Sequence, residues 1–138
     1  MKIAKDFYWE MGHRLYKYKG LCKNLHGHSY KMRVELEGTL NEKQMLMDYF
    51  DLSVIVQKII EPLNHAFLCE EDDEIVKEFL LKNNFKSVIV PFISTAENIA
   101  SYLLNLLKEQ LKIYNNIEKI TVRLYETDDV YAEVSCVL

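Results

Sequence analysis

The sequence predicts an α+β fold in which two long helices cover a four-stranded antiparallel sheet, in the order β-β-α-α-β-β. Three observations lead to this prediction. Apolar and polar residues alternate with a period of two in residues 29–38, 120–124 and 130–136, as in strands with one wet face. Two longer segments, 47–63 and 94–111, instead place apolar residues at helical spacing. Only a short turn separates the last two strands, which favours a hairpin.

The first two predicted strands lie near the N-terminus. Residues 3–15 read as a strand rich in aromatic side chains, and Gly20 lies in the connection that follows. The second strand is the clearest, because its apolar residues alternate with charged ones. These apolar residues are Tyr30, Met32, Val34 and Leu36. One face of this strand is therefore expected to be buried and the other wet.

The first long helix is predicted within residues 47–63, where Pro62 ends it. Its apolar positions are Leu52, Ile55, Val56, Ile59 and Ile60. Residues 72–84 are expected to form a short extra helix with acidic residues in its first turn, where the helix dipole favours them. A short extended piece, residues 87–92, comes next in the chain.

The second long helix is predicted within residues 94–111 and begins with clear capping residues. Ser94 or Thr95 can cap it, and Glu97 or Asn98 can reach back to the open amides. Its apolar face is expected to comprise Ile99, Leu103, Leu106, Leu107 and Leu111. The two final strands follow this helix, and residues 126–129 form the turn between them.

Composition restricts the classes of protein to which the chain can belong. It has 138 residues, 49% of them hydrophobic and 28% charged, which favours one globular domain over residues 1–138. The net charge of −4 argues against nucleic acid as a partner. No apolar run approaches the ~20 residues of a membrane span, and the N-terminus lacks a signal-peptide core. Three cysteines without a C-x-x-C unit indicate reduced thiols, so a cytoplasmic location is expected.

A candidate metal site lies in the stretch CKNLHGHSY, residues 22–30. His26 and His28 are two residues apart on a strand, so they share a face with Cα atoms roughly 6.6 Å apart. This spacing suits two imidazoles on one zinc ion, and His13 on the neighbouring strand is a candidate third ligand. A set of three histidines leaves one zinc position open, as in catalytic sites. The alternative is a pair of polar residues at the entrance of an ordinary strand.

Two further features surround this stretch. Cys22 lies four residues before His26, so its thiol is either a reactive group in the same pocket or a half-buried loop residue. Four basic residues gather in the connecting loop of this otherwise acidic protein: Arg14, Lys17, Lys19 and Lys23. They form either a patch that receives phosphates or a solvated lysine-rich loop.

Two candidate functional residues lie further along the chain. His65 follows the first long helix and is either a cap of that helix or a proton shuttle whose tautomer its neighbour Asn64 would set. Glu126 ends a strand, where it is either a charged turn residue or a carboxylate that grips the amino-pyrimidine edge of a heterocycle.

Several motifs together resemble one family. WEMGHRL, CKNLHGHSY, MDYFDL, LNHAFL, STAENIA and YETDD occur in family order over nearly the whole chain. The sequence resembles the 6-pyruvoyl-tetrahydropterin synthase superfamily, and within it the bacterial 6-carboxytetrahydropterin synthases of queuosine biosynthesis. The resemblance rests most specifically on the combination of C-x-x-x-H-G-H with an upstream histidine and a downstream A-E-N.

The resemblance implies a fold, an assembly and a set of site residues. The fold is the tunnelling fold (T-fold), in which sheets of neighbouring subunits join into a barrel and homo-oligomers are trimers or hexamers with active sites at subunit interfaces. His13, His26 and His28 are the implied ligands of Zn²⁺. Cys22 is the implied catalytic thiol, with His65 as its proton-transfer partner. The implied pterin-binding residues are Glu126, Thr95 and Glu97.

The implied reaction converts 7,8-dihydroneopterin triphosphate to 6-carboxy-5,6,7,8-tetrahydropterin, acetaldehyde and triphosphate. The chain departs from the family pattern at Asn64, where the family usually has aspartate, and at Cys69, where it often has asparagine. Three alternatives remain open. One is a 6-pyruvoyl-tetrahydropterin synthase that only eliminates triphosphate, another is a zinc- and pterin-binding relative whose catalysis Asn64 weakens, and the third is a structural protein without metal.

Overall fold

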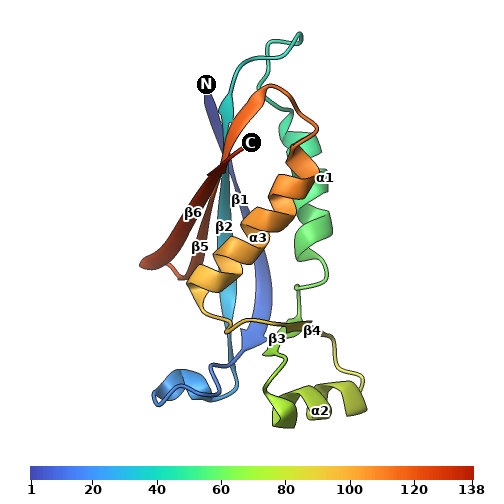
Figure 1. The fold of residues 1–138 in the computed structure, drawn as a ribbon, viewed down its shortest axis with the longest axis vertical. Coiled ribbons are helices and arrows are strands. Elements are labelled where there is room, and N and C mark those ends of the chain that lie inside the picture. The colour runs from blue at the N-terminus through green and yellow to red at the C-terminus, as the bar shows by residue number, and fades with distance from the viewer.

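The structure is a computed structural model that describes all 138 residues, and it combines a six-stranded sheet with three α-helices (Figure 1). The elements in chain order are β1 (Lys2–His13), β2 (His26–Gly38), α1 (Tyr49–Ile60), β3 (Ala66–Glu70), α2 (Glu74–Lys82), β4 (Ser87–Val90), α3 (Ala96–Leu111), β5 (Ile117–Thr127) and β6 (Val130–Val137). A short 3-10 turn, η1 (Leu21–Lys23), lies between β1 and β2.

The sheet differs from the prediction of four antiparallel strands. Its order is β4-β3-β1-β2-β5-β6, and the four strands β1, β2, β5 and β6 pair antiparallel as expected. Two more strands extend it beyond β1, because β3 pairs with β1 and β4 pairs with β3, both in parallel. The predicted α+β class holds, but the sheet is mixed and the element order is β-β-α-β-α-β-α-β-β.

The two added strands are short and do not alternate. The residues of β3 are almost all buried, so neither face of this strand is wet. A strand that is buried on both faces, as in parallel pairs, lacks the alternation of apolar and polar residues that marks an antiparallel strand with one face in water. The α2 helix provides the crossover that parallel pairing of β3 and β4 requires.

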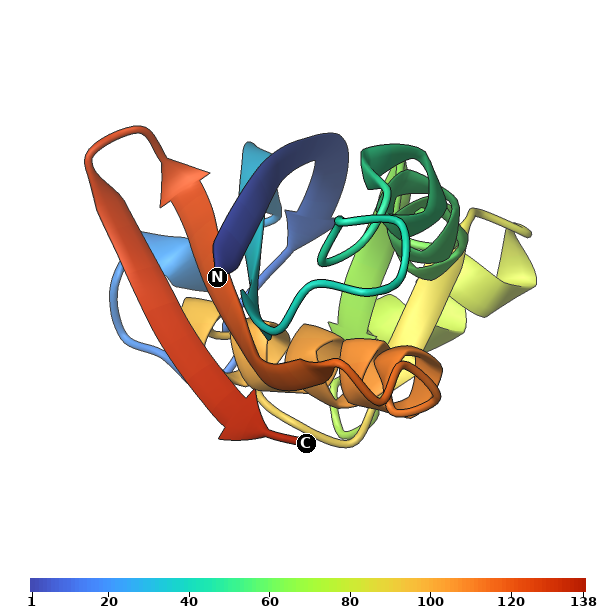
Figure 2. The ribbon, with the colours of Figure 1, turned by 90° about the horizontal axis from the view of Figure 1, so that it is seen from above.

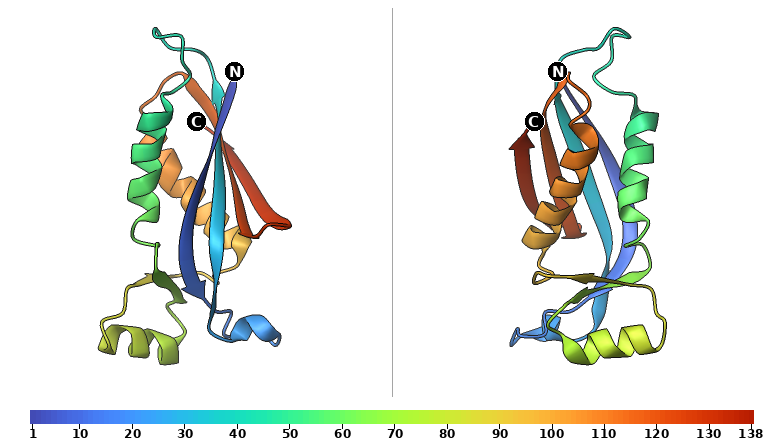
Figure 3. Two further views of the ribbon diagram at one scale, coloured as in Figure 1. Left: turned by 180° about the vertical axis from the view of Figure 1, so that it is seen from behind. Right: turned by 45° about the vertical axis from the view of Figure 1, so that its right-hand side comes forward.

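The helices α1 and α3 lie on the same side of the four antiparallel strands (Figure 3). α3 packs against β5 and β6, and α1 packs against α3 and β1 (Figure 2). The hydrophobic core lies between these layers and confirms the predicted alternation in β2, because Tyr30, Met32, Val34 and Leu36 are completely buried. In β1 the odd-numbered residues Phe7, Trp9 and Met11 face the same core.

Side chains cap the starts of both long helices, and the cap of α3 is Thr95, one of the two residues that the sequence predicts. The Asp48 carboxylate accepts the Phe50 N–H before α1, and the Thr95 hydroxyl accepts the Asn98 N–H before α3. α1 ends at Ile60, two residues before Pro62, which agrees with the prediction that this proline ends the helix. No helix in the structure is both long enough and apolar enough to span a membrane.

The opposite face of the sheet carries cross-strand ion pairs in place of a covering helix. Arg33 donates two hydrogen bonds to the carboxylate of Asp6, at 2.7 and 3.0 Å. Arg123 pairs with Glu133 on the next strands, at 2.7 Å. Such cross-strand pairs stabilise a water-facing surface only modestly, but they keep the long side chains in register.

The register of the first hairpin determines where the predicted ligands lie. The pairing runs without interruption from Lys2 opposite Glu37 to His13 opposite His26. His13 is therefore the last residue of β1 and stands beside the first residue of β2. Because side chains alternate along a strand, His28 points to the same face as His26, and this is the face of the core.

Candidate active site

The three predicted metal ligands converge at the loop end of the β1–β2 hairpin, where residues 14–25 connect the two strands. Their ring centroids are 4.6 Å apart for His13 and His26, 5.2 Å for His13 and His28, and 5.1 Å for His26 and His28. One nitrogen from each ring lies within 4.8 Å of the others. These three residues therefore form a cluster that can bind a metal ion.

Backbone carbonyls determine which ring nitrogen faces the centre of the cluster. Nδ1 of His13 lies 2.8 Å from the carbonyl oxygen of Ser94, and Nδ1 of His26 lies 2.8 Å from that of Asn24. A carbonyl only accepts, so each Nδ1 carries the hydrogen and each Nε2 presents a lone pair. Outer contacts of this kind orient histidines around metals.

The remaining nitrogens fit a metal ion, because Nε2 of both His13 and His26 is buried and has no hydrogen-bond partner. A buried polar atom without a partner costs free energy unless a further group satisfies it. Burial also lowers the pKa of His13 to about 4, although the hydrogen bond to Ser94 acts in the opposite direction. His13 is therefore neutral at neutral pH, which is the form that binds metals.

Glu126 lies beside the cluster at the end of β5. Its carboxylate oxygens are 3.8 Å from Nε2 of His13 and 3.9 Å from Nε2 of His28. The hydroxyl of Tyr30 donates to the same carboxylate at 3.4 Å. Burial and the nearby charge of Glu126 raise the pKa of Tyr30, so this phenol keeps its hydrogen and remains a donor. Tyr30 thereby helps to hold the carboxylate at the edge of the histidine cluster.

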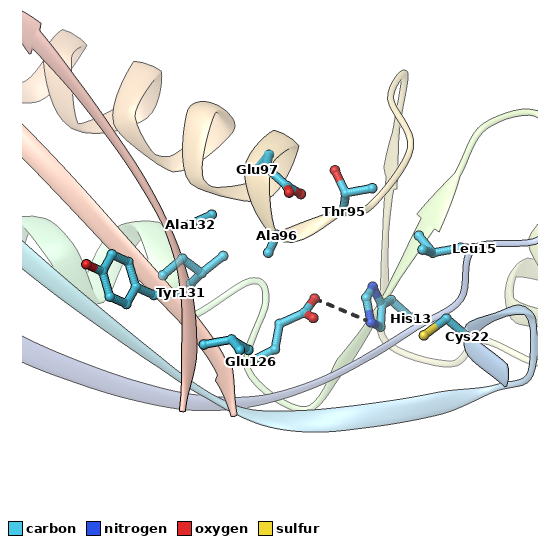
Figure 4. A pocket seen from close by; sticks show the side chains of 11 residues that line it. His13, Leu15, Cys22, Thr95, Ala96, Glu97, Glu126, Tyr131 and Ala132 are labelled. Atoms are coloured by element: carbon cyan, nitrogen blue, oxygen red, sulfur yellow. Dashed lines mark ion pairs between the residues drawn. The ribbon is translucent and has the colours of Figure 1, made fainter. Parts of the chain in front are cut away.

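A cavity of about 260 Å³ opens beside these residues (Figure 4). It brings together five of the predicted site residues, namely His13, Cys22, Thr95, Glu97 and Glu126. Four elements supply these residues, because His13 lies on β1, Cys22 lies on η1, Thr95 and Glu97 lie at the start of α3, and Glu126 lies on β5. The wall formed by β6 is mainly apolar and includes Val130, Tyr131 and Ala132.

Of the other four predicted residues, His26 and His28 belong to the histidine cluster, and Asn64 and His65 lie apart from this cavity. His65 instead lines a second hollow with Glu10, His28 and Ser29, at the junction of β1, β2 and β3. Within one chain, Cys22 and His65 therefore do not share a cavity. His28 contributes to both regions, since its ring belongs to the histidine cluster and the residue lines the second hollow.

The structure adds residues that the sequence did not single out for the site. Tyr30 contacts Glu126, and its position two residues after His28 on the same strand face was an available signal. Ser94 is completely buried against His13, whereas the sequence offered it only as a possible helix cap. No local pattern links Ser94 to His13, because their contact depends on the tertiary fold.

The basic loop between β1 and β2 is partly compensated by acidic residues. Arg14 donates two hydrogen bonds of 2.6 Å to Asp73, which also caps α2. Lys17 lies 3.9 Å from a carboxylate oxygen of Asp72. Of the four basic residues, only Lys19 and Lys23 form no ion pair.

Comparisons with known proteins match the chain to one family over nearly its whole length. The family described as "6-pyruvoyl tetrahydropterin synthase" matches residues 2–136. The protein named 6-carboxy-5,6,7,8-tetrahydropterin synthase from Haemophilus influenzae is 41% identical over 142 residues, with 96% of each chain covered. The Aquifex aeolicus protein of the same name is 29% identical, again with 96% of each chain covered.

Solved structures show the same fold at low sequence identity. The 6-pyruvoyl tetrahydropterin synthase of Plasmodium falciparum is 20% identical with a TM-score of 0.78, covering 100% of this chain and 98% of that one. An uncharacterized protein from Wolinella succinogenes is 24% identical with a TM-score of 0.82, covering 97% of each chain. The fold is therefore the T-fold, and the chain belongs to the 6-pyruvoyl tetrahydropterin synthase family of enzymes.

Proposed function

We propose that this protein is a zinc-dependent carbon–carbon lyase that acts in queuosine biosynthesis. It converts 7,8-dihydroneopterin triphosphate to 6-carboxy-5,6,7,8-tetrahydropterin, acetaldehyde and triphosphate, and residues 1–138 form its single pterin-binding domain. The observation that carries this proposal is the cavity in which His13 of the three-histidine cluster meets a thiol and two carboxylates. The names of the Haemophilus and Aquifex relatives support the choice of product.

Recognition of the pterin is assigned to the carboxylate of Glu126. The pyrimidine edge of a pterin presents a ring N–H and an amino group side by side, and one carboxylate can accept hydrogen bonds from both. The Tyr30 hydroxyl limits the rotation of this carboxylate, so the anchor is oriented before the substrate arrives. Thr95 and Glu97 line the same cavity at the start of α3 and supply further polar contacts.

His13, His26 and His28 would hold the Zn²⁺ ion. Bound there, the ion would supply Lewis-acid polarisation of oxygen atoms on the substrate side chain. The chain itself prepares the ligands, because Ser94 and Asn24 keep the hydrogens on Nδ1 of His13 and His26. Burial keeps His13 neutral, so no proton has to leave it before binding.

Proton transfer is assigned to the thiol of Cys22 and the imidazole of His65, each moving protons to or from substrate carbons. Because these residues line separate hollows of one chain, we infer that a homo-oligomer, a trimer or hexamer, completes the site with residues of a second copy. The position of β4 and β6 at the two edges of the sheet supports this inference, since unpaired strand edges favour pairing with another chain. The unpaired Lys19 and Lys23 of the loop beside Cys22 are assigned to the triphosphate.

Product analysis tests this function. The zinc-loaded protein is incubated with 7,8-dihydroneopterin triphosphate, and all products are identified by mass spectrometry. We expect 6-carboxytetrahydropterin and acetaldehyde in equal amounts, and their loss in Cys22→Ala. Triphosphate without acetaldehyde would instead identify a 6-pyruvoyl-tetrahydropterin synthase. Pterin binding without any turnover would identify a binding relative.

Zinc binding is tested separately from turnover. One equivalent of zinc per chain is expected in the wild type by elemental analysis, and His26→Ala is expected to lose it. Asn105→Ala, a change of an exposed residue on α3, is the matched control and should keep the metal. Equal metal content in all three proteins would contradict the assignment of the histidine cluster.

A further inference from the structure

The segment that carries His65 is held by hydrogen bonds to β1 and to Lys86. The backbone N–H of His65 donates to the carbonyl oxygen of Glu10 at 2.7 Å. The backbone N–H of Glu10 in turn donates to the side-chain oxygen of Asn64 at 3.2 Å. Lys86 donates to the carbonyl oxygens of Asn64, at 2.7 Å, and Glu61, at 2.8 Å. The peptide and the side chain before His65 are thus both held against one residue of β1.

The contact with Glu10 determines how the amide of Asn64 is oriented. A backbone N–H can only donate, so the atom that faces it must be the oxygen Oδ1. With the amide turned round, two N–H groups would face each other and a hydrogen bond would be lost. The orientation of Asn64 therefore follows from its contact with the main chain of β1, independently of His65.

The same oxygen also contacts the imidazole of His65. Nδ1 of His65 lies 2.9 Å from Oδ1 of Asn64. Because this atom is an acceptor, Nδ1 has to carry the hydrogen in the neutral ring. An amide oxygen has two lone pairs, so it can accept from Glu10 and from His65 at once. Nε2 is then the ring nitrogen that carries the free lone pair.

The backbone of His65 also indicates that its position is imposed by its surroundings. His65 has a φ of 59°, in the left-handed region that glycine favours, and it is one of three non-glycine residues with positive φ. The surrounding hydrogen bonds hold a histidine in this conformation, and the residue lines the hollow beside Ser29 and Glu10.

We propose that Asn64 is a positioning residue that holds neutral His65 in the tautomer with hydrogen on Nδ1 and leaves Nε2 as the proton acceptor. The main-chain N–H of Glu10 is the group that makes asparagine sufficient for this task. An aspartate, which the family resemblance places here, would select the same tautomer and add a negative charge. The role of Nε2 as an acceptor rests on the proposed function, whereas the tautomer does not.

This hydrogen-bonding geometry explains why asparagine at position 64 need not lower turnover as it does in the catalytic triad of serine proteases. There, replacing the aspartate of the catalytic triad by asparagine lowers turnover by about 10⁴-fold, because the wrong tautomer is favoured. In the present protein a donor on β1 fixes the amide, so the amide oxygen and not its nitrogen faces the imidazole. Asn64 thereby lacks only the charge of aspartate.

The test is the tautomer itself, read from nitrogen-15 NMR correlations of the imidazole rings at a pH where His65 is neutral. The chain has only four histidines, and the spectrum of His65→Gln assigns the signal. In the wild type we expect Nδ1–H to exceed Nε2–H by about tenfold or more. Asn64→Asp should keep this preference, and Asn64→Ala should reduce it at least severalfold. Asn105→Ala, remote from any histidine contact described above, should leave it unchanged.

Either of two outcomes would overturn the proposal. One is a wild-type His65 that carries its hydrogen mainly on Nε2, and the other is an unaltered preference in Asn64→Ala. The measurement needs no substrate, so its outcome is independent of the proposed reaction. If the tautomer is as expected but no pterin is converted, the proposed function fails and the positioning role of Asn64 stands.

Discussion

The buried histidine of the cluster should make the metal-free protein sensitive to mild acid. Burial holds the pKa of His13 near 4 in the folded chain, whereas exposure on unfolding returns it to about 6.5. Between these values the unfolded chain binds a proton that the folded chain does not, so the free energy of unfolding falls as the pH falls. From pH 7.5 to pH 5 this linkage removes about 2 kcal/mol through His13 alone. His28 acts in the same direction, because burial lowers its pKa too.

Urea denaturation of chelator-treated protein at pH 7.5 and pH 5 measures this effect. Acidic residues also titrate in this range, but they do so equally in the wild type and in His13→Gln, which has no ring to protonate. The loss of stability on acidification should therefore be smaller in His13→Gln by about 2 kcal/mol. His65→Gln is the matched control, because it removes an exposed histidine. Equal losses in the wild type and His13→Gln would refute the reasoning.

Three further predictions concern single contacts. Gly38→Ala should lower the free energy of unfolding, measured by urea denaturation, by about 1–3 kcal/mol, because its new Cβ meets the backbone carbonyl oxygen of Asn116 just before β5. Gly20→Ala, whose Cβ meets only an exposed aromatic ring, should cost less, and equal costs would contradict this account. Tyr30→Phe should weaken pterin binding up to about tenfold in calorimetry by releasing Glu126, and unchanged affinity would argue against that contact. The His65→Gly variant should be more stable in urea denaturation than His65→Ala by about 1 kcal/mol, because glycine adopts the positive φ of this position without strain. The reverse order of stability would contradict the presence of backbone strain.

The sequence predicted the antiparallel half of the sheet well because its information is local. Each of β2, β5 and β6 alternates, and the first hairpin and the two long helices follow from patterns within a few residues. The parallel half was not predicted as part of the sheet. Residues 66–70, which form β3, received no secondary-structure prediction, because these mostly buried residues carry no alternation and their partners lie far away in the chain.

The candidate site could likewise be predicted only where it depends on local patterns. The grouping of His13, His26 and His28 follows from strand register, and the structure confirms that they converge. The contacts that orient them do not follow from register, because Ser94 is distant in sequence from His13. The orientation of Asn64 likewise depends on a main-chain donor of β1. Every residue except proline has such a donor, so the sequence does not reveal this contact.

The continuous register of β1 and β2 also bears on how freely the chain can vary. The strands fix where His13 and His26 stand, so the connection from residue 14 to residue 25 need not be of any particular length to bring them together. A metal ion bound at this point would join the two strands at the base of the loop, so the loop itself would not have to hold them together. The loop that carries Cys22 and the lysines can thus lengthen, shorten or change its charge to suit a different substrate, while the ligand geometry stays as it is.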